Sequence, residues 1–483
     1  MGRAMKKLFN FSLIITATAL IITACGGSGK SRSLIESVSS FLNGNETIIG
    51  FGSARMNDIL EKTGYQQEAK IKAFLNEPLG QLKSSVNLDA PVYFAIEGPI
   101  VDGNPTATYL FIEVKNADSL KANLTKNGFE VKKGGDFDYA GEGDMNIAFD
   151  QGVAIVLIKP NVSDAKTALA EVRKKTQGDV STGYIADILS KKEDIVYGAS
   201  LANLYGTSNT DLEDLSADKQ KELRAMLQNS YIENGLKFEN GAIVLETKNH
   251  FSEALKSKLF LNKDGGAKIL SNLGNGKPRV GVSLNIDTKK LQEFLDEYAP
   301  NALEDLSDGI GGPFAMAMMV ANNDISKLID GRIGALVLGD ATQVVEGMTP
   351  DFNFYVGLSG QGKNFGQTIK DAISSDFQVV NLTDSGIAGF SSSAYAGKGI
   401  TLPEGAENFG KDAFNLFIDL SDVNLDEFQL EGGAKMAELV KYISVSYNLE
   451  GGQVIIKAKD GKENALKQLF NKALRTFEDE IAI

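Results

Sequence analysis

The chain has 483 residues, 43% of them hydrophobic, with 63 acidic and 49 basic side chains and a formal net charge of −14. This excess of negative charge argues against nucleic acid or an anionic lipid surface as the main partner. The single cysteine excludes an internal disulfide, so packing alone must stabilise the fold.

The first 24 residues are organised like a bacterial export signal. Three basic residues lie within the first seven positions, residues 8–24 are an almost unbroken apolar run, and small residues precede Cys25. This arrangement is typical of a secretory signal. We therefore expect residues 1–24 to be removed, which changes the net charge to −14 − 3 = −17. The alternative is an uncleaved anchor helix with an incidental cysteine.

The tetrapeptide Ile22-Thr23-Ala24-Cys25 resembles the lipobox of bacterial lipoproteins. This resemblance implies that the Cys25 thiol carries a diacylglyceryl group, that the signal is cut before Cys25, and that the new N-terminus is acylated. Several acyl chains anchor a protein stably where one does not, at about 0.8 kcal/mol per buried CH₂. Residues 25–33 would then be a flexible tether.

The composition of the tether bears on localisation. In Bacteroidota lipoproteins an acidic cluster just after the cysteine is associated with export to the cell surface. Residues 26–33 contain no acid and two basic side chains, Lys30 and Arg32. By resemblance, we expect an outer-membrane anchor facing the periplasm, with exposure at the cell surface as the alternative.

A strand–turn–helix pattern recurs along the mature chain. Each copy begins with an apolar strand-like run, passes a polar turn and continues with apolar residues at helical spacing. The four copies are residues 107–126, 241–260, 351–370 and 452–471. Strands followed by a short helical turn precede them at residues 47–62, 194–206, 279–295 and 413–428.

The order of these segments is the same in the two halves of the chain. About 460 mature residues are also too many for one hydrophobic core. We therefore expect an α+β fold of two tandem, weakly similar halves, residues 34–268 and 277–483, each a mostly antiparallel sheet with helices packed on one face. The break would lie in residues 263–278, which end in Asn-Gly-Lys-Pro. Generic alternation of strands and helices would give a similar pattern.

Together, the lipobox and this patterning resemble a family of Bacteroidota lipoproteins of about this length that share a domain of unknown function. The resemblance covers most of the mature chain through patterning, without a sharp motif. It implies a place in the cell envelope and no particular chemistry.

Two motifs match only part of a known catalytic or nucleotide-binding motif. Residues 357–363 have the glycine and lysine spacing of a phosphate-binding loop, but Asn364 stands where Ser or Thr would bind Mg²⁺. His250 is the only histidine, so neither a typical His-based zinc site nor a triad with a G-x-S-x-G elbow is present. We expect no nucleotide, no cofactor and no catalytic residue.

An acidic cluster has the spacing of the start of a calcium loop. Its members are Asp419, Asp422, Asn424 and Asp426, but Gly433 stands where a bidentate Glu is needed. We therefore expect structural roles for these acids and no metal site.

Met316, Met318 and Met319 form the one conspicuous methionine stretch. Methionine surfaces adapt to varied apolar ligands, so this stretch is either an apolar binding surface or part of the core.

The leading hypothesis is a lipid-anchored, non-enzymatic envelope protein that acts as a binding or interaction subunit of a membrane-associated complex. Its partners would be the membrane, through the acyl chains on Cys25, and another envelope protein, with no nucleic acid and no nucleotide. One alternative is a periplasmic carrier of apolar ligands, such as lipids or peptides. Another is a hydrolase with two facing carboxylates at about 5–10 Å.

Overall fold

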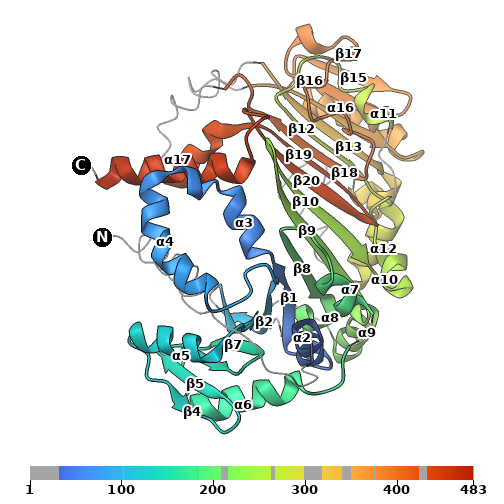
Figure 1. Ribbon diagram of the computed structural model, residues 1–483. Coiled ribbons are helices and arrows are strands. Elements are labelled where there is room, and N and C mark those ends of the chain that lie inside the picture. The colour runs from blue at the N-terminus through green and yellow to red at the C-terminus, as the bar shows by residue number, and fades with distance from the viewer. Residues whose placement is uncertain are drawn as a thin grey trace. The chain divides into compact units, whose positions relative to one another are not determined.

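The computed structural model describes residues 32–101, 103–181, 183–207, 216–262, 267–298, 318–339, 350–374, 377–423 and 432–481. These residues form an α+β fold of long antiparallel strands and helices, which confirms the predicted fold class (Figure 1). The chain divides into an N-terminal unit, residues 1–214 with 228–237, and a C-terminal unit, residues 215–227 with 238–483.

This division lies at a different place from the expected break in residues 263–278. Strand β10 (Ala242–His250) lies in the C-terminal unit, where it pairs with β20 (Gly451–Ala458) near the C-terminus.

In the N-terminal unit the strands pair in the order β9-β8-β1-β2-β3-β7-β6-β5-β4, each pair antiparallel. Their bounds are β1 (Ile48–Ala54), β2 (Val92–Val101), β3 (Asn104–Glu113), β4 (Lys132–Lys133), β5 (Asp138–Glu142), β6 (Met145–Phe149), β7 (Val153–Ile158), β8 (Ile195–Ser200) and β9 (Tyr231–Glu239). The helices are α2 (Leu34–Leu42), α3 (Met56–Lys62), α4 (Ala69–Lys83), α5 (Ala117–Lys126), α6 (Ala165–Thr176), α7 (Tyr184–Leu189) and α8 (Leu201–Thr207).

Helix α2 shows how local sequence positions the N-terminal core. Ser33 and Glu36 form a capping box that satisfies backbone donors at the start of the helix. The helix then buries Val38 and Phe41, and the Phe41 ring centroid lies 4.8 Å from that of Tyr109 on β3. α2, α6 and α7 together contribute to one hydrophobic core with β1, β2, β3 and β8.

The C-terminal unit has the strand order β10-β20-β19-β18-β12-β13-β14-β16-β15, again antiparallel throughout. The strands of this order not yet given are β12 (Val280–Asn285), β13 (Ile329–Leu338), β14 (Asp351–Leu358), β15 (Val379–Thr383), β16 (Gly386–Phe390), β18 (Phe414–Asp419) and β19 (Val440–Asn448). A separate, parallel pair is formed by β11 (Asn275–Gly276) and β17 (Gly399–Ile400). Its main helices are α9 (Ala217–Leu227), α10 (Glu253–Lys258), α11 (Ala267–Leu270), α12 (Thr288–Tyr298), α16 (Gly366–Ile373) and α17 (Ala465–Ile481).

The two units share part of their strand order. Seven neighbouring strands of one sheet are β9-β8-β1-β2-β3-β7-β6, and seven of the other are β19-β18-β12-β13-β14-β16-β15. In both series the third strand comes first in the chain and the first strand comes last, and the others also match, so the connections between strands are the same. The four predicted strand–turn–helix segments are β3–α5, β10–α10, β14–α16 and β20–α17. Local periodicity therefore located these segments correctly.

Candidate apolar binding face

The sheet of the C-terminal unit has two faces of opposite character. Successive side chains of a strand point to opposite faces, so each strand contributes to both. Along β12, β13, β14 and β18, buried residues alternate with half-buried ones, and every second residue shares a face. We call the less covered side the apolar face, defined by the residues below.

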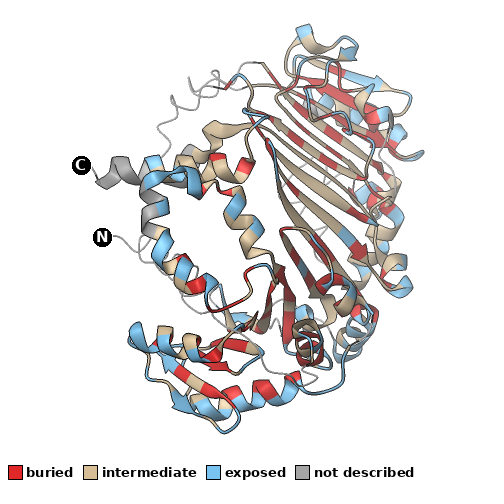
Figure 2. Cartoon of the chain, viewed as in Figure 1, coloured by how far each residue is buried: buried red, intermediate tan, exposed pale blue. Residues whose placement is uncertain are grey.

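The apolar face consists of three rows that cross seven neighbouring strands, as the strand registers show. The first row is Ile243, Ile456, Ile443, Ile418, Val280, Val337 and Phe352; the second is Leu245, Val454, Val445, Leu416, Val282, Ala335 and Phe354; the third is Thr247, Gly452, Tyr447, Phe414, Leu284, Ile333 and Val356. All of these residues are half-buried, as the tan colour along the strands in Figure 2 shows. None carries a charge, and only Thr247 and Tyr447 have a polar side-chain group.

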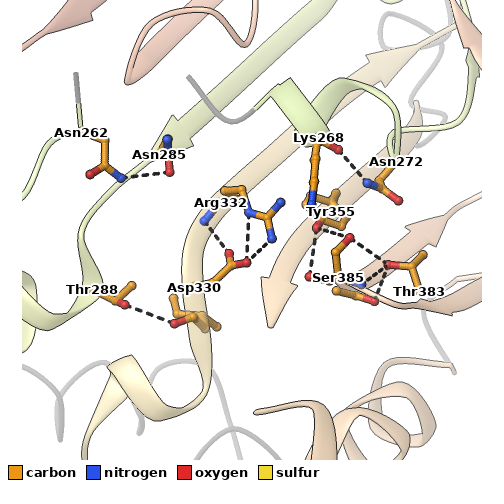
Figure 3. Close-up of polar contacts among 12 residues, drawn as sticks. Asn262, Lys268, Asn272, Asn285, Thr288, Asp330, Arg332, Tyr355, Thr383 and Ser385 are labelled. Carbon is orange, nitrogen blue, oxygen red and sulfur yellow. Dashed lines mark hydrogen bonds and ion pairs between the residues drawn. The ribbon is translucent and has the colours of Figure 1, made fainter. Parts of the chain in front are cut away.

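On β12, β13, β14 and β18 the opposite face is mostly buried yet holds polar side chains, whereas on β19 both faces are half-buried. Asn415 donates to the Ser283 hydroxyl at 3.2 Å, and Asn353 donates to the Leu273 carbonyl at 2.9 Å. The Tyr355 hydroxyl lies 3.1 Å from the Ser385 carbonyl (Figure 3). These bonds satisfy the amide donors and the tyrosine hydroxyl, while the buried Oδ1 atoms of Asn353 and Asn415 have no hydrogen-bond partner among the described residues.

Glycines allow close packing on this buried face. A Cβ on Gly334 would lie 2.3 Å from Ile269 of α11, and one on Gly281 would lie 2.3 Å from the Phe417 ring. Such a Cβ could not be accommodated without a shift, so the side chains of α11 and β18 already fill this space. The face with more polar and small residues is therefore the covered one.

The burial of the polar and apolar faces in this sheet is the reverse of the usual pattern. A half-solvated antiparallel sheet normally buries its apolar side and exposes its polar side. Here, on β12, β13, β14 and β18, the half-buried Val, Ile and Leu rows are the less covered side. Near β14, α16 and its neighbours cover the apolar face, where Phe354 packs with Ile369 and Phe377.

Charged groups of the C-terminal unit are paired outside the three rows. Glu297 on α12 lies between Lys219 and Lys258, and hydrogen bonds from these two amines lower the pKa of the Glu297 carboxyl. Asp330 and Arg332 form a pair on β13 (Figure 3), and its hydrogen bond raises the pKa of the Arg332 guanidinium. The apolar face thus offers a ligand dispersion contacts and desolvation with no formal charge.

Two surface hollows are found in the described chain. One of about 260 Å³ in the C-terminal unit is lined by Thr247 and Gly452 of the third row together with Asp412, Ser446, Asn448, Glu450 and neighbouring residues. One of about 320 Å³ in the N-terminal unit is lined by Ser40, Asn43, Lys175, Asp179 and neighbours. Both linings include charged side chains, which an aliphatic ligand would have to desolvate.

Several of the predicted site residues lie outside the described residues. They are the predicted lipidation site Cys25, the other lipobox residues Ile22, Thr23 and Ala24, and Met316. Met318 is 1% exposed and packs in a core with Ile325 and Leu328, so it does not contribute to a surface. Met319 is 73% exposed.

The loop that resembles a phosphate-binding loop is packed against the backbone of Leu328, directly before β13. The Gly362 backbone N–H donates to the Ser359 hydroxyl at 2.9 Å, and a Cβ on Gly362 would lie 1.9 Å from the Leu328 carbonyl oxygen. Glycine at position 362 is therefore required by close backbone packing. His250 ends β10 and is half-buried.

Asp419 is an ion-pair partner in this fold. Its side chain is 5% exposed and accepts from Arg279 at 3.4 Å and from the Ser421 hydroxyl at 2.6 Å. Asn424 and Asp426 lie outside the described residues. Among the residues that can be described, no group of three or more His, Cys, Asp or Glu side chains is placed to hold a metal ion.

Sequence reasoning missed the apolar face, although a signal was present. Segment 280–285 alternates Val, Val and Leu with Gly, Ser and Asn, and segment 351–358 alternates in the same way. Period-two alternation predicts a strand with one buried face. It does not tell which face is covered.

No protein-family model matches this chain, and no curated protein matches it. Among solved structures, crystal form III of TP0453 is similar over 47% of this chain and 82% of that chain, with 9% identity and a TM-score of 0.28. Crystal form I of TP0453 is similar over 46% of this chain and 81% of that chain, with 8% identity and a TM-score of 0.28. Within the described ranges, no helix is both long enough and apolar enough to cross a membrane. The function of this chain is therefore inferred from its own residues.

Proposed function

We propose that this chain is a lipid-anchored, non-enzymatic protein of the bacterial cell envelope that binds an aliphatic chain, such as the tail of a lipid, on the apolar face of its C-terminal unit. The observation that carries the proposal is the reversed polarity of the sheet. Its Val, Ile and Leu rows are half-buried, while Ser283, Asn353 and Asn415 on the other face of β12, β14 and β18 are buried.

The composition of the apolar face favours an aliphatic ligand over a protein partner. Binding hot spots between proteins are rich in Trp, Tyr and Arg, whereas Leu and Val are under-represented. The central row is Leu, Val, Val, Leu, Val, Ala and Phe, with neither Arg nor Trp. Such a surface gains free energy mainly by removing apolar area from water, at about 25 cal/mol per Å².

The dimensions of the face also suit a lipid tail. Seven strands spaced about 4.8 Å apart give a face about 29 Å wide. The hydrocarbon core of a bilayer is about 30 Å thick and contains two layers of acyl chains, so one extended chain covers about half of this width.

The expected anchor supports a role at the membrane. Acyl chains on Cys25 would hold the protein beside a lipid surface, and tethering raises the effective concentration of a binding site near its ligand. Cys25→Ala is expected to abolish labelling of the protein by radioactive palmitate, because no acyl group can attach. Growth of the cells with labelled palmitate followed by immunoprecipitation checks this, with Ser28→Ala as the matched control. A parent protein that takes up no label, or a Cys25→Ala protein labelled as strongly as the parent, would contradict lipidation at Cys25.

The binding proposal is tested with two adjacent residues that point to opposite faces of β19. Val445 lies in the central row, and Ser444 lies on the other face. The assay uses the mature chain with Cys25→Ala and measures the fluorescence of cis-parinaric acid as it enters an apolar site. Val445→Asp is expected to weaken binding at least tenfold, because a carboxylate on the apolar face is costly to desolvate.

The same assay gives the control. Ser444→Asp adds the same charge one residue away and is expected to leave binding within about twofold, while thermal unfolding by circular dichroism shows that both variants fold. If the parent protein does not bind cis-parinaric acid, or if both variants bind it equally well, the proposal is wrong.

A further inference from the structure

We infer that the N-terminal unit carries a second apolar binding site, on strands β8, β1 and β2, that takes the same class of ligand, an aliphatic chain. This inference rests on the proposed function of the C-terminal unit. In the shared strand order, β8, β1 and β2 correspond to β18, β12 and β13, which form the centre of the apolar face.

Glycines show which face of these strands is covered. A Cβ on Gly198 would lie 2.6 Å from Ile188 of α7 and 3.1 Å from the Phe51 ring, so that face is closed by the core. Gly50 and Gly52 share the opposite face. A Cβ on Gly50 would meet only the Gly198 carbonyl oxygen at 3.7 Å and Ile96 Cδ1 at 4.0 Å, which are ordinary contacts, whereas a Cβ on Gly52 would lie 2.7 Å from the Phe94 ring. The face is therefore open for a side chain at Gly50, while Phe94 fills it at Gly52.

The open face is apolar along the registers that contain Gly50. One row is Ala199, Gly50, Ile96 and Thr108, and the next is Tyr197, Gly52, Phe94 and Leu110. None of these side chains is charged, and Tyr197 is 37% exposed. Both rows therefore repeat the character of the apolar face in the C-terminal unit.

Helix α8 extends this surface. It packs against β1 and β2, and Asn203 donates to the Ile48 carbonyl at 2.8 Å. Leu204 and Tyr205 on the same helix are 37% and 42% exposed. The site thus has a floor of glycine and alanine beside the larger Ile96 and Tyr197.

The small floor indicates the kind of ligand. Gly50 and Ala199 are paired on neighbouring strands about 4.8 Å apart, and neither has a side chain beyond Cβ. A narrow polymethylene chain can lie against such a floor and contact Ile96 and Tyr197. The rows contain neither the Arg nor the Trp that protein–protein hot spots favour.

The absence of tryptophan from the whole chain makes a local test possible. Tyr197→Trp and, separately, Phe414→Trp place a single reporter on the N-terminal or the C-terminal face of the mature Cys25→Ala chain. Dibromostearate is the probe, because its bromines quench tryptophan fluorescence only at contact, and stearate without bromine is the control. Saturable quenching of both reporters is expected.

A matched pair of substitutions then locates the first site. Because a Cβ on Gly50 would make only ordinary contacts, Gly50→Ala fits the strand, and Gly50→Asp adds a carboxylate at the same Cβ. Gly50→Ala is expected to retain quenching of the Tyr197→Trp reporter, and Gly50→Asp to weaken it at least tenfold without changing the Phe414→Trp signal. Circular dichroism shows that each variant is folded.

The outcomes separate this inference from the proposed function. If the Phe414→Trp reporter is quenched and the Tyr197→Trp reporter is not, the second site is refuted and the first remains. If neither is quenched, both fail. Equal quenching of the Tyr197→Trp reporter in the Gly50→Ala and Gly50→Asp proteins would also refute the second site.

Discussion

Leu336→Ala is expected to lower the free energy of unfolding by about 3 kcal/mol, while Val337→Ala in the same strand lowers it by about 1 kcal/mol or less. Leu336 is 0% exposed and packs with Ile269 and Phe417 on the buried face. Val337 lies on the apolar face and is half-buried. Removing a half-buried side chain loses less transfer free energy and leaves no enclosed cavity.

Urea unfolding followed by far-ultraviolet circular dichroism measures both free energies. The comparison is informative because the two residues are adjacent and both are aliphatic, so strand propensity changes little. Equal destabilisation would mean that the apolar face is as tightly packed as the buried face, and the proposed ligand site would then lose its main support.

Asp419→Ala is expected to lower the free energy of unfolding by about 2–4 kcal/mol, since breaking a buried ion pair leaves its partners without compensation. The Asp419 carboxylate accepts from Arg279, whose side chain is 19% exposed, and from both the backbone N–H and the hydroxyl of Ser421. The two Ser421 donors would lose their acceptor, and Arg279 would keep only the exposed Asp422.

Asp422→Ala is the matched control. Asp422 contacts Arg279 at 3.3 Å, but its side chain is 64% exposed. Exposed ion pairs contribute about 0–1 kcal/mol, so this variant should be nearly as stable as the parent. Added calcium is expected to leave the melting temperature of the parent unchanged. A calcium-dependent increase that Asp419→Ala abolishes would show that Asp419 is a metal ligand after all.

Some features of this protein followed from local sequence. Strand–turn–helix segments such as residues 107–126 were recognisable because hydrophobic periodicity is set by neighbours two to four positions apart. The α+β class followed from the same signal. The expected export signal and the tetrapeptide Ile22-Thr23-Ala24-Cys25 also depend on a short run of residue types, and they stay predictions.

Pairing over long distances was not readable in the same way. Segment 241–260 was expected to close the first half, but β10 pairs with β20, about 200 residues later in the chain. An alternating strand can pair with many others, and only the assembled sheet selects one partner. The exposure of single side chains is also not readable from local sequence. Met318 is 1% exposed, whereas its neighbour Met319 is 73% exposed.

The face of the sheet that carries the proposed function was decided by tertiary structure alone. Sequence shows that Val280, Val282 and Leu284 share one face of a strand and that Gly281 and Ser283 share the other. By composition, the first set would be buried. Ile269 of α11 instead packs above Gly334, and Phe417 packs over Gly281, so the polar side is covered. Which side of a sheet is buried depends on where distant helices pack, and no local pattern contains that information.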